Sequence, residues 1–449
     1  MSKASDDKML DNLQHDTFQY FLHESNPRNG LVKDKTAPHW PASIAAVGLA
    51  LAAYPVGVEC GYLSRADAVQ RTLATLRFFH DSPQGTQSDA TGYKGFYYHF
   101  LDMDTGRRVW NCELSTIDST FLLAGGLTAA AYFTGNAEGE REIRDLADAL
   151  YRRADWVWAQ HGGKTVTHGW TPEKGFIPYR WEGYDEALLL YVLGLGSPTH
   201  ALSADSYPAW AATYVWKHIY GIEFLYAGPL FIHQLSHIWL DLRDIQDAPM
   251  RAKDSNYFEN SRRATRAQQE YSIRNPQDYT GYSEQCWGVT ASDGPGPTNR
   301  KIDGVERTFY DYLARGVPFG PDDGTISPWA VVSSLPFAPD IVIPTIAYFD
   351  RMELRIDNPY GFKATYNPTY PVKTSNKYGW VSPWHFGINQ GPIVLMIENY
   401  RSGMLWDLMR ACGYIRDGLR RADFQGGWLA QADQEHAAPR AQPAEGDGR

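Results

Sequence analysis

The chain has 449 residues, which is enough to bury a large core, and at about 150 residues per domain it allows about three domains. Its 42 basic and 52 acidic residues leave a net charge of −10, which argues against a protein that holds nucleic acid or an anionic membrane through a basic surface. Aromatic residues make up 14% of the chain, including 15 Trp and 28 Tyr, and this content excludes a disordered chain. Because Tyr and Trp combine an apolar face with a polar tip, they suit either a core or a wet binding cleft.

Cysteine use and the first residues bear on the compartment. Four scattered cysteines predict neither a disulfide framework nor a zinc site: Cys60, Cys112, Cys286 and Cys412. The first residues lack the basic-then-apolar pattern of a signal peptide. The sequence as written therefore predicts a cytoplasmic protein, or a periplasmic or secreted one if a signal was removed. The longest apolar run, 44–58, is too short for a membrane span. No cofactor is predicted.

Most of the chain predicts helices, beginning with an amphipathic one over 5–23. Two kinds of helix then alternate. The first kind is apolar nearly all round and is expected to be buried on every side: 44–54, 114–133, 184–196, 231–242, 326–334 and 389–400. The second kind is charged or amphipathic and is expected at the surface: 64–80, 138–160, 208–219, 251–273, 341–355 and 405–420.

Six alternating pairs predict an all-α fold, an (α/α)6 toroid with an inner ring of apolar helices inside an outer ring of amphipathic ones. An α-solenoid competes with this prediction, but it needs more regular repeats. No linker interrupts residues 1–429, which favours one domain. The segment 430–449, rich in Ala, Pro, Gln, Gly and Asp, is predicted to be a disordered tail.

The connections predict where a site lies. Those from inner to outer helices are short, whereas those from outer to inner helices are long: 81–113, 161–183, 220–230, 274–325 and 356–388. If the inner helices run parallel, all the long loops meet at one mouth, and long loops on a rigid scaffold commonly carry function. Aromatic residues are concentrated in these loops, which indicates a surface on which sugars stack.

Two acidic residues occupy equivalent positions before successive apolar helices. Glu113 precedes the second of these helices and Glu182 precedes the third. In the predicted toroid both reach the same mouth. Two carboxylates beside a cleft are what acid/base cleavage of a glycosidic bond requires. Trp110 and Trp181 lie nearby in the sequence, where they suit stacking on a sugar or desolvation of a neighbouring carboxyl group.

Structural explanations compete with several of these functional ones. Acidic residues are favoured at helix N-termini, so Asp118, Asp185 and Glu186 also fit capping and first-turn roles. His233 and His237 have the spacing of two metal ligands on a helix but lack the Glu of HExxH, which favours packing or substrate contact, and no metal is predicted.

Several segments then resemble the glycoamylase-like family of bacterial (α/α)6 proteins, whose characterised relatives include β-1,2-glucanases and the domain attached to cyclic β-1,2-glucan synthases. The matching segments span about residues 10–420 and are 113–118 (ELSTID), 181–185 (WEGYD), 231–237 (FIHQLSH), 290–295 (TASDGP), 323–325 (DGT), 334–339 (SLPFAP) and 391–400 (GPIVLMIENY). The resemblance implies a glycoside hydrolase that acts on β-glucan, with Glu182 as general acid and Glu113 as the assisting carboxylate. Relatives commonly have Asp where this chain has Asn389, and an amide cannot act as a base.

The resulting hypothesis is an endo-β-1,2-glucanase that releases sophoro-oligosaccharides with inversion, without nucleic acid or membrane partners. The residues expected to bind substrate are Asp118, Trp181, Tyr184, His233, Trp287, Asp293, Trp380 and Trp384. The alternatives are a transglycosylase on the same glucan, a glycan-binding protein without turnover, a lyase, and an α-glucan-cleaving glucoamylase.

Overall fold

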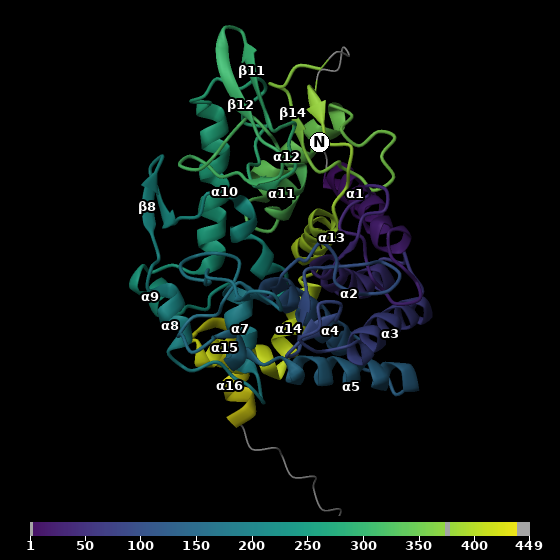
Figure 1. The fold of residues 1–449 in the computed structure, drawn as a ribbon. Helices are drawn as coiled ribbons and strands as arrows, with labels where there is room; N and C mark the ends of the chain where they lie inside the picture. The colour runs from purple at the N-terminus through teal and green to yellow at the C-terminus, as the bar shows by residue number, and fades with distance from the viewer. Residues whose placement is uncertain (1–2, 373–377, 438–449) are drawn as a thin grey trace, which may run out of the picture.

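The computed structural model describes residues 3–372 and 378–437, and the fold is helix-rich (Figure 1). The longer helices are α1 (Lys3–His23), α2 (Ile44–Glu59), α3 (Arg65–Asp81), α4 (Thr116–Tyr132), α5 (Glu138–Arg153), α10 (Tyr257–Arg274), α12 (Pro339–Arg351) and α13 (Gly387–Arg401). The shorter ones are α6 (Trp156–Ala159), α7 (Leu188–Gly196), α8 (Ser206–Ala211), α9 (Ala248–Ala252), α11 (Pro328–Ser333), α14 (Met404–Ala411), α15 (Gly413–Arg421) and α16 (Gly427–Ala437). Two 3-10 turns, η1 (Leu230–His233) and η2 (Leu235–Ile238), lie between α8 and α9.

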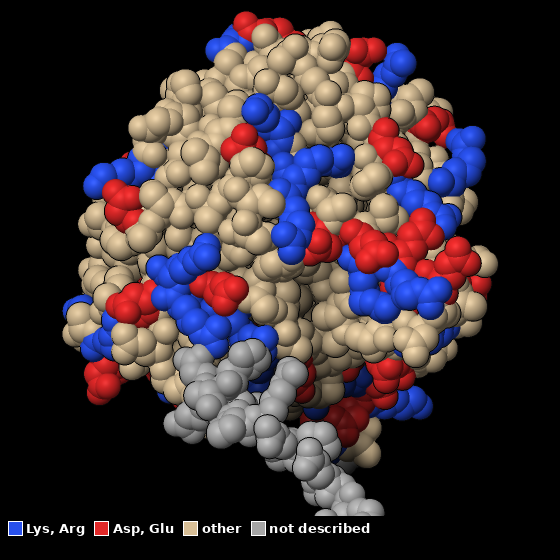
Figure 2. Space-filling view, turned by 90° about the horizontal axis from the view of Figure 1, so that it is seen from below, with Lys and Arg blue, Asp and Glu red and all other residues tan. Residues whose placement is uncertain are grey.

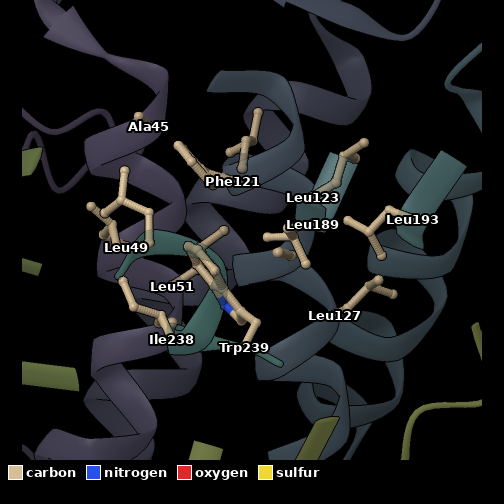
Figure 3. Packing of buried hydrophobic residues seen from close by; sticks show 14 of the residues in the cluster. Ala45, Leu49, Leu51, Phe121, Leu123, Leu127, Leu189, Leu193, Ile238 and Trp239 are labelled. Carbon is tan, nitrogen blue, oxygen red and sulfur yellow. The ribbon is translucent and has the colours of Figure 1, made fainter. Parts of the chain in front are cut away.

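The apolar helices form the interior. Helix α2 packs against α4 and α13, α4 contacts α7, and α13 contacts α11. The two 3-10 turns join α7 to α11, because the Ser236 hydroxyl accepts from the Leu189 amide (3.2 Å) and the Gln234 side chain donates to the Ala330 carbonyl (2.6 Å). Figure 3 shows side chains of α2, α4, α7 and η2 meeting in one core, where Phe121 stacks on Trp239 at a centroid distance of 5.5 Å.

Glycine brings α2 and α4 unusually close together. A Cβ atom on Gly48 would lie 2.2 Å from the carbonyl oxygen of Phe121, and one on Gly125 would lie 2.0 Å from the carbonyl oxygen of Gly48. Both helices also begin with a serine cap: the side chains of Ser43 and Ser115 accept from backbone amides of the first turn. The small residues and the capping motif in the sequence therefore fix both the spacing and the starting points of these two helices.

The amphipathic helices cover this interior. Helix α5 buries Ile143, Ala147 and Leu150 and turns most of its charged side chains outward. Two ion pairs join it to α3: Arg65 with the buried Glu140 (2.8 Å) and Arg77 with Glu142 (2.5 Å). On the face seen from below, basic and acidic side chains are interspersed (Figure 2). Among the described residues, no helix is long and apolar enough to span a membrane.

Short strands in the long loops were not predicted, so the all-α description is incomplete. A five-stranded antiparallel sheet has the order β2-β3-β5-β6-β7, formed by Gly92–Tyr93, Phe96–Tyr98, Leu114–Ser115, Gly169–Thr171 and Gly175–Phe176. The two-stranded pairs are β1 (Ala42–Ser43) with β4 (Phe100–Leu101), β8 (Trp216–Ile219) with β9 (Ile222–Leu225), β10 (Ala291–Ser292) with β13 (Leu313–Ala314), β11 (Thr298–Ile302) with β12 (Val305–Phe309), and β14 (Tyr366–Asn367) with β15 (Trp380–Val381). The sheet ties together the loops before α4 and before α7.

Several helix predictions are wrong in part. The predicted helices 138–160, 251–273 and 405–420 are each divided in two, as α5 and α6, α9 and α10, and α14 and α15. The segment 208–219 stays helical only to Ala211, because the aromatic and β-branched residues after it form strand β8, and Tyr220 and Gly221, both at positive φ, close a two-residue hairpin with β9. The segment 231–242 forms 3-10 turns broken at Gln234, whose side chain bonds to α11. Helix α7 begins at Leu188, not at 184.

The C-terminal prediction also changes. Residues 430–437 belong to helix α16, so the expected disordered tail starts later than 430, and residues 438–449 of it lie outside the described residues.

A fully buried ion pair fastens the loop between β12 and α11. The Arg315 guanidinium donates to both carboxylate oxygens of Asp323 (2.8 and 2.9 Å), and neither side chain is exposed to solvent. Arg315 also donates to the carbonyl oxygens of Ser292, Tyr310 and Asp311. This one side chain therefore holds β10, β13 and the turn around Tyr312 in place.

Candidate active site

A cavity of about 500 Å³ opens where α2, α4 and α13 begin. The serine caps of α2 and α4 both line it, so the N-termini of these helices point toward it. Its polar lining contains Asp34, Lys35, Ser43, His99, Glu113, Ser115, Asp118, His168, Glu186 and Asn389. Its aromatic lining contains Trp40, Phe100, Phe121, Trp181, Phe231, Tyr312, Trp329 and Phe386. A concave site with many aromatic walls and a few convergent polar groups is typical of ligand binding.

His99 lies between two carboxylates in this cavity. Its Nδ1 is 2.8 Å from Glu113 Oε1, and its Nε2 is 3.7 Å from Asp118 Oδ2. The imidazole stacks on Phe100 at a centroid distance of 3.9 Å. Asp118 is held in turn by Ser115, whose hydroxyl donates to Asp118 Oδ2 and accepts from the Asp118 amide. The predicted capping motif is therefore present, and its carboxylate also faces the cavity.

The charges in this cluster support one another. Burial lowers the pKa of His99, but the negative charges of Asp118 and Glu113 outweigh burial and raise it to about 9. Burial raises the pKa of Glu113, and the hydrogen bond and positive charge of His99 more than offset it, so the pKa falls below its usual value. At neutral pH the cluster is an imidazolium between two carboxylates.

This arrangement predicts a pH-dependent contribution to stability. Because the pKa of His99 is about 9 in the folded protein and 6.5 for the free side chain, its stabilisation is complete below pH 6.5 and is lost as the pH rises through 9. The difference in unfolding free energy between wild type and His99→Gln is expected to fall by about 3 kcal/mol between pH 6 and pH 10. Urea denaturation at several pH values measures it.

The matched control is His80→Gln. His80 makes the same type of contact, with Nδ1 2.8 Å from Asp81 Oδ1, but on the surface. Its removal is expected to change stability by no more than about 1 kcal/mol at any of these pH values. A difference between wild type and His99→Gln that does not vary with pH would contradict a charged His99.

Glu186 is a further ionisable residue in the cavity wall. Burial, together with the negative charges of Asp185 and Asp118, raises the pKa of Glu186 to about 8. A hydrogen bond from its own backbone amide partly offsets this rise. Among the described residues, no other side chain hydrogen-bonds the carboxyl group, which leaves it available to a ligand. The neighbouring Asp185 is used differently, because its Oδ1 accepts from the Ala187 amide (3.0 Å) and from Trp210 Nε1 (3.0 Å). Glu186 is thus a protonated carboxylic acid in the cavity wall at neutral pH.

Another part of the cavity wall combines an acidic residue, a basic residue and aromatic rings. Trp40 Nε1 donates to Asp34 Oδ2 (2.9 Å), and the ammonium group of Lys35 lies 4.0 Å from the centre of the Trp40 ring. Burial raises the pKa of Asp34. Elsewhere in the cavity, Trp181 stacks on His168 at 3.9 Å and donates through Nε1 to Thr116 Oγ1 (3.0 Å). Such rigid aromatic walls suit the apolar faces of sugar rings.

The structure brings together only some of the residues that the sequence singled out. Glu113, Asp118 and Trp181 line the cavity, as does Asn389. Glu182 does not line it: this side chain is exposed, and its Oε1 accepts from Thr165 Oγ1 (2.8 Å). The structure therefore does not bring Glu182 into the cavity lining beside Glu113, and its catalytic role stays a prediction. Gly183, at a φ of 87°, turns the chain so that Glu186 enters the cavity instead.

The other predicted contacts are set back from the cavity lining. Trp287 is fully buried in a separate hydrophobic cluster and donates to Thr345 Oγ1 (3.0 Å), so its predicted role as a sugar platform is wrong. Tyr184 and His233 pack on each other at 5.1 Å, behind the wall. Burial lowers the pKa of His233 to about 4, which fits a neutral packed imidazole.

The remaining three predicted residues come from the loops around β10 and β15. Asp293 accepts from the Ser382 hydroxyl (2.7 Å), and burial raises its pKa. Trp380 pairs with Asn367 in β14–β15, and the amide of Trp384 donates to Ser382 Oγ (3.3 Å). None of the three residues lines the cavity.

Sequence reasoning missed His99, Asp34 and Tyr312, and gave Glu186 a structural role. For Glu186 a signal existed, because it directly follows the motif 181–185, four residues after Glu182. For His99 there was none, since a lone histidine in a run of aromatic residues has no motif. Among the described residues, no group of three or more His, Cys, Asp or Glu side chains has the geometry to hold a metal ion.

Comparison with known proteins shows the family of this chain. The family model described as “Glycoamylase: Putative glucoamylase” matches residues 178–413, more than half of the chain. The chain belongs to this family. Among solved structures, this chain resembles a protein from Bacteroides uniformis described as a “putative glucoamylase”. The TM-score is 0.83, and the identity is 31% over 96% of this chain and 100% of that one. The resemblance seen in the sequence motifs is thus confirmed.

Two further proteins that this chain resembles have named activities. An endo-β-1,2-glucanase from Chitinophaga pinensis, solved with sophorotriose and glucose, has a TM-score of 0.81 and 26% identity over 94% of this chain and 99% of that one. An exo β-1,2-glucooligosaccharide sophorohydrolase from Parabacteroides distasonis is 27% identical over 93% of this chain. This chain spans 58% of the length of that curated relative.

Proposed function

We propose that the protein is a glycoside hydrolase that cleaves β-1,2-linked glucan, with Glu186 as the general acid. The observation that carries this proposal is a carboxyl group that is protonated at neutral pH and lines an aromatic-walled cavity. A carboxylic acid with a raised pKa is the group that protonates the leaving oxygen of a glycosidic bond. The named activities of the relatives support β-1,2-glucan as the substrate.

The acid role assigned to Glu182 from sequence therefore passes to Glu186. We assign to Asp118 the role of the base that activates the attacking water, because Asp118 lines the same cavity and its charge acts on Glu186. Glu113 keeps an assisting role: it holds His99, which in turn fixes Asp118. We further propose that the protein cleaves bonds within the glucan chain (endo cleavage) and inverts the configuration of the anomeric centre.

Product analysis tests this function. The purified protein is expected to release sophoro-oligosaccharides from linear β-1,2-glucan, with polarimetry reporting the anomer first formed. Products longer than the substrate would indicate transglycosylation instead. Cleavage of another glucan, with none of the β-1,2-linked polymer, would contradict the substrate while leaving the reaction class intact.

A glycan-binding protein without turnover is the second candidate, and Asn389 is the observation that favours it. Asn389 lines the cavity, and its amide side chain cannot act as the base that activates water. Such a protein would bind β-1,2-glucan without releasing product, and Glu186→Gln would leave its affinity unchanged.

We also propose that the helices close into an (α/α)6 toroid within a single domain over residues 1–429. The contacts of α2 with α4 and α13, of α4 with α7 and of α13 with α11, together with the link from α7 through η1 and η2 to α11, support an inner ring of six members. The outer ring would contain α3, α5, α10, α12 and α14–α15, with α8 as its shortest member.

A further inference from the structure

Trp110 stands at the rim of the cavity with an exposed ring. Its side chain is 56% exposed, although tryptophan is usually buried. The ring packs edge-on against Trp40 at a centroid distance of 5.0 Å and lies 5.3 Å from Phe100. Trp40 and Phe100 both line the cavity, whereas Trp110 lies beyond them. The three rings therefore continue the aromatic wall outward.

The backbone holds this exposed ring in an uncommon conformation. Trp110 and Asn111 are consecutive non-glycine residues at positive φ, 56° and 49°. This region costs free energy for residues with a Cβ atom, and such positions cluster at functional sites. Asparagine tolerates this region, but a bulky side chain such as that of Trp110 is uncommon in it.

A buried arginine maintains the turn. The side chain of Arg108 is 1% exposed and donates to the carbonyl oxygens of Asn111 (2.7 Å) and Cys112 (2.5 Å). Its other contacts are an ion pair with Glu173 (2.7 Å) and the ring of Tyr98 at 4.7 Å. Because these bonds follow directly after Trp110 in the chain, they fix the direction in which its ring projects.

We propose that Trp110, supported by Trp40 and Phe100, forms an outer subsite for the substrate. At this subsite the Trp110 ring stacks on a glucosyl unit of the glucan chain that is cleaved at Glu186. This inference rests on the proposed function. The occupant follows from the continuity of the rings with the cavity wall: a chain that leaves the cavity along this wall presents the apolar face of its next pyranose ring to Trp110. The subsite would therefore favour longer substrates.

The test compares long and short substrates. For Trp110→Ala, kcat/KM on long β-1,2-glucan is expected to fall about tenfold or more, as for loss of an anchoring aromatic side chain. On the shortest β-1,2-gluco-oligosaccharide that the wild type cleaves, kcat/KM is expected to stay within about twofold, since a loss of under 0.5 kcal/mol is what a surface substitution away from the ligand costs. Trp110→Phe, which keeps a ring, is expected to retain most of the activity on long chains.

Phe319→Ala is the matched control. Phe319 is 65% exposed and packs on Tyr226 and Lys217, away from the cavity lining, so its removal is expected to spare both substrates. Equal losses on long and short substrates, or no loss on either, would overturn the subsite. If Trp110→Ala does not fold, Trp110→Gln provides the same comparison.

A binding measurement separates this inference from the proposed function. Calorimetry with long β-1,2-glucan on the Glu186→Gln background is expected to show weaker binding when Trp110→Ala is added. If the wild type cleaves no β-1,2-glucan, the proposed function fails. If it does cleave the polymer but chain length has no effect on the Trp110 variants, the outer subsite alone fails.

Discussion

Replacing Glu186 with Gln is expected to lower kcat/KM on β-1,2-glucan by a factor of about 10²–10⁴, the usual contribution of a general acid. The amide keeps the size of the side chain but has no acidic proton for the leaving oxygen. Initial rates of reducing-sugar release, with the variant's melting temperature as a check on folding, measure the effect. Because the acid is active while protonated and its pKa is about 8, wild-type kcat/KM is expected to fall as the pH rises above 8.

Glu182→Gln is the control for this experiment, since the two glutamates lie only four residues apart in the sequence. Glu182 is exposed and bonded to Thr165, outside the cavity lining, so its loss is expected to leave turnover nearly unchanged. If Glu182→Gln abolished turnover while Glu186→Gln retained it, the original sequence-based assignment would be restored. Loss of activity without any change in glucan binding would still agree with Glu186 as the acid.

Removal of one partner of the buried Arg315–Asp323 pair is expected to give the largest loss of stability. Arg315→Met leaves the Asp323 carboxylate buried without its counter-charge and leaves three backbone carbonyls without their donor. Such a change commonly costs about 3–5 kcal/mol. Chemical denaturation of the variant and the wild type measures the difference in unfolding free energy.

Arg266→Met is the surface counterpart, because Arg266 pairs with Asp340 at 2.9 Å on exposed helix faces. Its loss is expected to cost no more than about 1 kcal/mol. The double variant Arg315→Met/Asp323→Leu, which removes both buried charges, is expected to be more stable than Arg315→Met alone. Equal costs for Arg315→Met and Arg266→Met would show that burial of the pair is energetically unimportant.

The sequence predicted the interior of the fold well because burial leaves a strong compositional signal. Helices such as α2 and α4 are apolar on every side, and their glycines mark where the two backbones approach. It predicted the loops poorly, since the strands in them are two to five residues long and depend on partners distant in sequence. Local hairpins are the exceptions: two-residue turns join β8 to β9 at Tyr220–Gly221 and β11 to β12 at Asp303–Gly304.

The site shows the same division. Glu113 and Asp118 precede or begin a helix whose start is fixed by a serine cap, so their positions could be predicted. Glu182 and Glu186 could not be distinguished, because the start of α7 at Leu188 and the turn at Gly183 decide which carboxylate faces inward. The sequence does not distinguish Trp287 from Trp181. Only the packing around each residue decides that Trp287 lies in the core and Trp181 in the cavity wall.

The five-stranded sheet has a consequence for engineering. Its middle strand, β5, carries Ser115 and follows Glu113 directly, and it pairs with β3 on one side and β6 on the other. His99 follows β3 and His168 precedes β6, so three stretches of chain that line the cavity share one hydrogen-bonded frame. A loop taken from a relative would bring only part of that frame. Exchange of specificity between family members is therefore expected to require transplanting the segments around β3, β5 and β6 together.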